Sequence, residues 1–184
     1  MNFFIMHGVY ANPEANWFPW LKKELESRGH EVAVPKFPTP LDQSLESWFR
    51  AFANYENKIN EETVFIGHSL GAAFILNYLE QTNKKIKAAY LIAPFHKFLG
   101  SSYDELNKTF IGKEFNWEKI KSSCSKFFIF ASDNDKYIPF EITKELVEKL
   151  NAEFNIVPNG GHLNKESGYE DFYLLLECIM IDLE

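Results

Sequence analysis

Cysteine is scarce in this sequence of 184 residues, and long hydrophobic runs and an excess of positive charge are absent. The two cysteines, Cys124 and Cys178, have no disulfide or metal-ligand spacing, which indicates a reduced compartment such as the cytoplasm and no metal site. Apolar runs such as 127–131 are far too short to cross a bilayer. The net charge of −7 repels phosphate backbones and anionic lipid, which argues against a nucleic-acid or membrane partner.

The composition is that of a globular chain. Hydrophobic residues make up 46% and charged residues 24%, and the 16% of aromatic residues includes 18 Phe, which favours a large apolar interior. No repeat, linker or low-complexity tract interrupts the sequence. The N-terminal stretch 1–6 lacks the basic start of a secretory signal and is typical of a strand. We therefore expect residues 1–184 to form a single domain.

Apolar runs of strand length alternate with segments of helical periodicity, the pattern of parallel βαβ units. This pattern predicts an α/β fold, with a parallel sheet covered by helices on both faces and ligands bound at the carboxyl ends of the strands. Asn16 is expected to cap the first helix, and segment 95–116 has no clear period and forms at most a small cap. Strands are expected at about 2–7, 31–34, 63–66, 86–92, 126–131 and 153–157, and helices at about 17–28, 44–59, 70–81, 140–150 and from 166.

The stretch 67–71 reads G-H-S-L-G and fits the nucleophile-elbow pattern G-x-S-x-G. Small residues flank the serine because the strand and the helix approach each other closely at such a turn. The turn exposes the Ser69 hydroxyl and leaves the Leu70 N–H free to stabilise an oxyanion. An inert serine in a glycine-rich turn is the alternative. The motif directly follows an apolar strand and begins an amphipathic helix, a context that favours the nucleophile.

A serine hydroxyl needs a base at neutral pH, and five histidines compete for that role. His162 follows the sixth strand in a glycine-rich loop, on the same edge of the sheet as the serine. His30 lies at the opposite edge, and His68 is too close in sequence to turn back onto the serine. His7 suits a structural hydrogen bond in the first loop, and His96 is the weaker alternative base.

The acid that orients the base is expected in the loop 132–139, which follows the fifth strand and contains Asp133 and Asp135. Their spacing does not separate the two, and either one could instead form a turn. The first loop supplies Gly8 and then Val9 and Tyr10, and the N–H of Val9 or Tyr10 is a candidate second oxyanion donor. A plain turn that requires glycine is the alternative for this loop.

Together these motifs resemble the α/β-hydrolase superfamily, and more narrowly the small serine hydrolases of the YdeN and retinoblastoma-binding-protein-nine type. The resemblance implies a three-layer α/β-hydrolase fold with a six-stranded sheet in the order 2-1-3-4-5-6 and no cofactor. It also favours Asp135, because the family's acid lies four residues before a proline, here Pro139. The glycine run of lipase oxyanion loops is absent. The matching stretches are 7–8, 16–22, 67–71, 117–120, 131–139 and 160–162.

The expected function is that of a serine hydrolase. Ser69 is the nucleophile, His162 the base and Asp135 the acid, and a small ester-like molecule is the partner and substrate. A carboxylesterase is the default; thioester, small-amide or cofactor-free haloperoxidase-like activity would use the same residues. A protein-interaction module with a vestigial site is the rival. Apolar residues of segment 95–116 are expected either to line an acyl pocket or to pack onto the sheet: Phe95, Phe98, Leu99, Tyr103, Leu106, Phe110 and Phe115.

Overall fold

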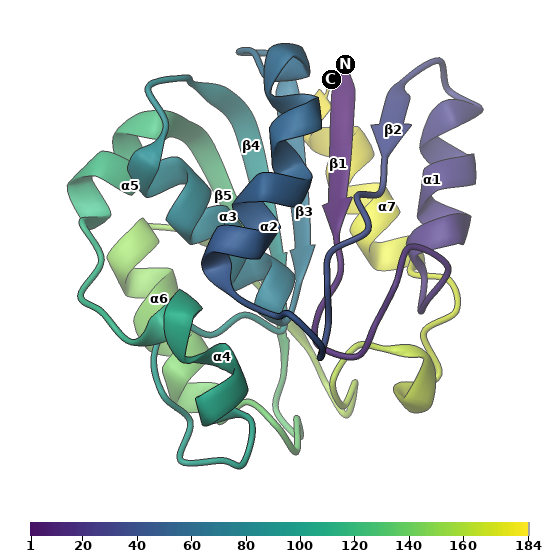
Figure 1. Cartoon of the computed structure of the whole chain (residues 1–184). Coiled ribbons are helices and arrows are strands. Elements are labelled where there is room, and N and C mark those ends of the chain that lie inside the picture. The colour runs from purple at the N-terminus through teal and green to yellow at the C-terminus, as the bar shows by residue number, and fades with distance from the viewer. Residues whose placement is uncertain (184) are drawn as a thin grey trace.

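A single parallel sheet forms the centre of the computed structural model, which describes residues 1–183 (Figure 1). The strand order is β2-β1-β3-β4-β5-β6, and every neighbouring pair is parallel, as the sequence and the resemblance predict. Because β1 and β3 are neighbours, the loops that follow them lie at the same edge of the sheet. The strands are β1 (Asn2–Met6), β2 (Glu31–Ala33), β3 (Thr63–His68), β4 (Ile86–Ile92), β5 (Cys124–Ser132) and β6 (Glu153–Val157).

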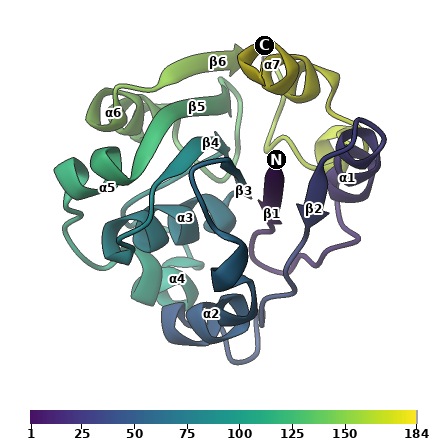
Figure 2. The same ribbon diagram turned by 90° about the horizontal axis from the view of Figure 1, so that it is seen from above.

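Helices cover both faces of this sheet and make three layers (Figure 2). One face is covered by α1 (Phe18–Glu26) and α7 (Tyr173–Leu183). The other is covered by α2 (Leu45–Phe52), α3 (Leu70–Gln81), α4 (Asp104–Ile111), α5 (Trp117–Ser123) and α6 (Phe140–Leu150). In the described chain, 1–183, no helix is both long and apolar enough to span a bilayer.

The sheet separates two apolar cores, and alternate residues of each strand enter opposite cores. On β1, Phe4 and Met6 join the core under α3, whereas Phe3 and Ile5 join the core under α1 and α7. All six residues of β3 are buried, which explains why its centre, residues 64–66, is an unbroken apolar stretch instead of an alternating pattern.

The first helix begins differently from the prediction. Asn16 does not cap it: the N-cap residue is Trp17, which makes no side-chain capping bond. Asn16 has a left-handed backbone with φ 52°, and its Oδ1 accepts the N–H of Lys165, which lies 149 residues further along the chain. The sequence prediction was wrong here because this distant contact takes up the side chain.

Two other predicted helices are shorter in the structure. The helix expected over 44–59 is α2 up to Phe52, followed by a 3-10 turn, η1 (Ala53–Lys58). The last helix begins at Tyr173, not near residue 166, because a separate 3-10 turn, η2 (Lys165–Ser167), occupies that position. Gly168, with φ 92°, ends η2 in a left-handed conformation that favours glycine.

Segment 95–116 contains α4, where the sequence indicated no regular structure, and α5 follows directly. The Asp104 carboxylate folds the preceding loop against the start of α4 by accepting the N–H groups of Leu99, Gly100 and Ser101. Asn77 of α3 donates to the Phe110 carbonyl with its Nδ2, at 2.9 Å. The segment therefore packs as a fixed wall next to the carboxyl ends of the strands.

Candidate active site

Ser69 lies in a strained turn between β3 and α3. Its φ of 55° and ψ of −117° are unusual for a residue other than glycine, and its N–H donates to the Ile92 carbonyl at 2.9 Å. A Cβ on Gly71 would lie 2.1 Å from the Met6 oxygen, and a Cβ on Gly67 would lie 2.6 Å from the Ile75 side chain. Glycine is therefore required on both sides of the serine, as the elbow pattern predicts.

The side chains of His162 and Asp135 form a close pair. Nδ1 of His162 is 2.7 Å from Oδ2 of Asp135, and the two side chains are only 10% and 4% exposed. Oδ1 of Asp135 accepts the N–H groups of Tyr137 at 2.8 Å and Ile138 at 3.2 Å, which fixes the carboxylate. With a proton on Nδ1 facing Asp135, Nε2 is the ring nitrogen left to act as a base.

The neighbouring carboxylate, Asp133, has a different contact. Its Oδ1 accepts the N–H of Asn159 at 2.8 Å. Asn134 acts in the same way, because its Oδ1 accepts the N–H of Gly161 at 2.7 Å. Both residues thereby join the loop after β5 to the loop that contains His162.

His68 supports the backbone of the His162 loop, a role that the sequence did not indicate. Its Nε2 lies 2.9 Å from the carbonyl oxygen of His162, and Trp17 donates to the next carbonyl along the chain, that of Leu163, at 3.0 Å. Burial lowers the pKa of His68 to about 3, so its ring is neutral and Nε2–H is the donor. The contact joins residues 94 positions apart, which no local pattern reveals.

His7 fixes the first loop, as the sequence predicts. Its Nε2 accepts the N–H of Phe37 at 3.0 Å, so Nδ1 bears the proton and donates to the Gly8 oxygen at 2.9 Å. Burial lowers the pKa of His7 and keeps the ring neutral. In a trans peptide the Gly8 carbonyl and the Val9 N–H point in opposite directions, so this bond also fixes the direction of the Val9 N–H.

The two candidate donors in this loop differ in their contacts. The Tyr10 N–H donates to Thr39 Oγ1 at 2.9 Å, whereas no acceptor for the Val9 N–H occurs in the described chain, 1–183. Gly8 lies against the nucleophile, since a Cβ there would be 3.0 Å from Ser69 Cβ. Leu70 begins α3, where N–H groups have no partner within the helix. These contacts favour Val9 and Leu70 over Tyr10 as free donors next to Ser69.

The remaining histidines lie elsewhere. His96 is buried next to Trp117, with its Nε2 3.3 Å from Glu145 Oε1, and burial lowers its pKa. The ring of His30 packs against Phe3 at the opposite edge of the sheet. Within the described residues no group of three or more His, Cys, Asp or Glu side chains is arranged to hold a metal ion.

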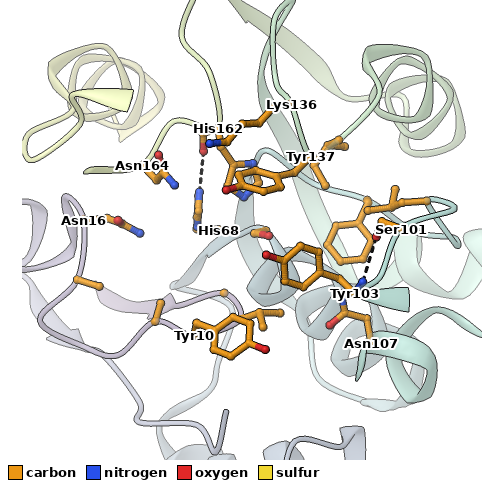
Figure 3. A pocket seen from close by; sticks show the side chains of 18 of the residues that line it. Tyr10, Asn16, His68, Ser101, Tyr103, Asn107, Lys136, Tyr137, His162 and Asn164 are labelled. Carbon is orange, nitrogen blue, oxygen red and sulfur yellow. Dashed lines mark hydrogen bonds between the residues drawn. The ribbon is translucent and has the colours of Figure 1, made fainter. Parts of the chain in front are cut away.

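A pocket of about 450 Å³ opens over Ser69 and His162 (Figure 3). Three tyrosines form an arc on one side: the ring centroids of Tyr10 and Tyr103 are 6.3 Å apart, those of Tyr103 and Tyr137 6.1 Å, and Tyr137 lies 4.9 Å from the His162 ring. Asn16 and Asn164 line the other side.

The expected lining residues of segment 95–116 are only partly present in this pocket. Phe95, Leu99 and Tyr103 line it. Phe110 and Phe115 are core residues, Phe98 is 51% exposed, and Leu106 lines a neighbouring cavity. Sequence reasoning missed the asparagines Asn16, Asn107 and Asn164. Asn164, two residues after His162 in the same loop, is the one that its position could have indicated.

Comparison with known proteins gives relatives over nearly the whole chain. YdeN of Bacillus subtilis is 30% identical over 178 residues, which are 96% of this chain and 93% of YdeN. The crystal structure of YdeN superposes with a TM-score of 0.93 and covers 99% of this chain and 98% of its own. The serine hydrolase RBBP9 of Rattus norvegicus is 27% identical over 155 residues, covering 84% of this chain and 81% of RBBP9.

The fold extends to more distant esterases. Est1E of Butyrivibrio proteoclasticus, solved with ferulic acid, has a TM-score of 0.74 at 15% identity, with 99% of this chain and 89% of Est1E covered. The family model described as serine hydrolase matches residues 3–179. With its six-stranded α/β-hydrolase sheet and its elbow at the edge of that sheet, the chain belongs to the serine hydrolase family.

Proposed function

We propose that this hydrolase is a carboxylesterase that acts on small esters through an acyl-serine, with Ser69, His162 and Asp135 as a catalytic triad. The observation that carries the proposal is the 2.7 Å contact of His162 Nδ1 with Asp135 Oδ2. The His162 ring lines the same pocket as Ser69, the serine of the strained elbow. The family match supports the hydrolase class, and the contact of His162 with Asp135, together with the pocket that His162 shares with Ser69, supports the triad.

The mechanism is acyl transfer in two halves. His162 Nε2 takes the proton of Ser69 as its oxygen attacks the ester carbonyl, and the tetrahedral intermediate collapses when His162 returns that proton to the leaving alkoxide. An alcohol departs and the acyl group remains on Ser69. Water, deprotonated by His162, then attacks the acyl-serine, and the products are a carboxylic acid and free Ser69. Asp135 holds the ring and stabilises its charged form.

The oxyanion of each tetrahedral intermediate is assigned to the N–H groups of Val9 and Leu70. The Val9 N–H has no acceptor within residues 1–183, and the Leu70 N–H lies at the start of α3. Gly8 brings the first loop against Ser69. His7 supports this arrangement, because its bond to the Gly8 oxygen orients the same peptide plane. A fixed donor needs no rearrangement as charge develops on the oxygen.

Replacement of the nucleophile tests the proposal. Ser69→Ala should lower kcat for p-nitrophenyl acetate by about 10⁵-fold or more, because the nucleophile is lost. It should also abolish labelling by a fluorophosphonate probe. Ser122→Ala is the matched control, since Ser122 is exposed on α5, outside the pocket. Wild-type protein that is folded but neither turns over the ester nor takes the label would overturn the proposal in favour of an interaction module.

A further inference from the structure

The pocket that Ser69 and His162 line has two chemically different sides. In Figure 3 the labelled side chains of Asn16 and Asn164 lie on one side of His68, and those of Tyr103 and Asn107 lie on the other. Phe95 and Leu99, from the same segment as Tyr103, also line the pocket and, with Ile138, join the core under α3. We call the first the amide side, defined by Ala15, Asn16 and Asn164, and the second the aromatic side, defined by Phe95, Leu99, Tyr103 and Ile138.

On the amide side, the oxygen of each side-chain amide accepts hydrogen bonds from the protein, whereas the nitrogen does not donate to it. Oδ1 of Asn16 accepts the N–H of Lys165 at 3.0 Å, and Oδ1 of Asn164 accepts the N–H of Ser167 at 3.1 Å and its hydroxyl at 3.0 Å. These bonds fix which end of each amide is oxygen. Neither Nδ2 has an acceptor among residues 1–183, and in Figure 3 both nitrogens point toward the interior of the pocket.

Two free N–H₂ groups next to His162 favour one kind of substrate atom. An oxygen that accepts hydrogen bonds gains a partner there, whereas an alkyl group would cover both amides and displace their water without replacing it. The aromatic side is the more apolar of the two, because Phe95 and Ile138 are buried there and Leu99 and Tyr103 complete the wall beside the single amide of Asn107.

The tetrahedral intermediate determines which part of the ester meets which side. Its carbon bears the Ser69 oxygen, the oxyanion at Val9 and Leu70, the leaving oxygen at His162 Nε2, and the acyl chain. The leaving oxygen must be within reach of His162 to receive its proton. Asn164 is two residues further along the same loop and, like His162, lines the pocket, so we place the group attached to that oxygen on the amide side. The acyl chain takes the remaining direction, along the aromatic side.

We infer that the substrate is an ester of a polar, oxygen-bearing alcohol with a short apolar or aromatic acid, and that Asn16 and Asn164 recognise the alcohol. This inference rests on the proposed esterase function and adds the substrate class and two specificity residues. Each amide contributes through Nδ2–H to an acceptor oxygen of the leaving alcohol.

The test uses two isosteric esters, 2-methoxyethyl butyrate and butyl butyrate, which differ by one ether oxygen in the alcohol. The kcat/KM for each ester is divided by the rate of its alkaline hydrolysis, and the quantity compared is the ratio of these values, methoxyethyl ester over butyl ester. For the wild-type protein this ratio should be about two to ten, the effect of one neutral hydrogen bond. Asn16→Asp and Asn164→Asp keep the Oδ1 acceptor and lose the donor. Each should reduce this ratio to about one or below, since a carboxylate cannot donate to an ether.

The matched control is Asn12→Asp. Asn12 lies in the same loop as Asn16, and its Oδ1 likewise accepts a backbone N–H, that of Glu14 at 2.8 Å, but the residue is exposed and outside the pocket. It adds the same charge and should keep the wild-type ratio. A second ester pair, ethyl 3-methoxypropanoate and ethyl pentanoate, places the ether oxygen in the acyl chain. Its ratio should not respond to either pocket variant.

The outcomes separate this inference from the proposed function. Fluorophosphonate labelling of Ser69 and turnover of all four esters establish the esterase, whatever the ratios are. The inference is overturned if the wild-type protein has no preference for the methoxyethyl ester, if Asn16→Asp and Asn164→Asp change the ratio no more than Asn12→Asp, or if only the acyl-side pair responds. Absence of labelling and turnover in the wild-type protein contradicts both proposals.

Discussion

Asp133 and Asp135 are two positions apart in the loop after β5, and their carboxylates have different partners. Oδ2 of Asp135 faces His162 Nδ1 at 2.7 Å, whereas Oδ1 of Asp133 accepts the N–H of Asn159. Asp135→Asn should lower kcat by about 10⁴-fold, because an amide that donates to Nδ1 stabilises the wrong tautomer of the ring. Steady-state kinetics with p-nitrophenyl acetate at neutral pH measures this effect.

Asp133→Asn is the paired control for that prediction. Asparagine retains Oδ1, so the bond from the Asn159 N–H survives, and kcat should change less than about tenfold. If Asp133→Asn proves the more damaging of the two, the acid of the proposed triad is Asp133. Thermal unfolding of both variants distinguishes a lost catalytic group from a loosened loop.

At the scale of elements, the N-terminus of α3 packs directly against the carboxyl end of β1. Gly71 is the point of contact, and a Cβ there would lie 2.1 Å from the Met6 oxygen. Helix propensity alone predicts that Gly71→Ala stabilises the protein by about 1 kcal/mol. The contact with backbone predicts the opposite sign, a loss of about 1–3 kcal/mol or more in the free energy of unfolding, with a displaced elbow and reduced activity. Urea denaturation gives the sign, and a stabilised variant would contradict the close approach.

The sequence predicts the regular elements well where local pattern and packing agree. The predicted ranges 70–81, 86–92 and 153–157 coincide with α3, β4 and β6. It fails for α4, although Asp104 and Glu105 in the first turn and Lys108 in the last are ordinary helix signals. The loop before Asp104 has no regular sequence pattern, so the start of the short helix is not recognisable from the sequence. In the structure the Asp104 carboxylate fixes that loop by accepting three backbone N–H groups.

The candidate site likewise contains residues that the sequence predicts and residues that it does not. Ser69, Asp135 and His162 each follow a predicted strand at the same edge of a parallel sheet, so topology alone places them together. Asn16 and His68 contact residues 149 and 94 positions away, and their roles depend on how two loops meet. No periodicity or spacing contains that information, and only the three-dimensional structure supplies it.

For the molecule as a whole, buried histidines make stability depend on pH. Burial lowers the pKa of His68 to about 3 and also lowers the pKa values of His7 and His96. In the unfolded chain these side chains titrate near 6.5. Below that pH the unfolded state binds protons that the folded state does not bind, so the free energy of unfolding decreases as the pH falls from about 6.5 toward 3.

The overall charge predicts the opposite trend. At pH 7 the net charge is −7, and acidification toward pH 5 reduces the repulsion among surface carboxylates. His68→Gln separates the two effects: it removes the titrating group and leaves an amide that can donate to the His162 carbonyl. Between pH 7 and pH 5 the wild-type protein should lose about 2 kcal/mol more in the free energy of unfolding than this variant, as a pKa of about 3 implies.

Urea denaturation at the two pH values measures that difference, and His30→Gln is the control. His30 lies at the opposite edge of the sheet and is only half-buried, so its replacement should leave most of the pH dependence in place. Because the elbow and the His162 loop meet at His68, its protonation on unfolding links the pH stability of the whole molecule to the site. Equal losses in the wild-type protein and His68→Gln would mean that the ring of His68 is accessible to protons in the folded state.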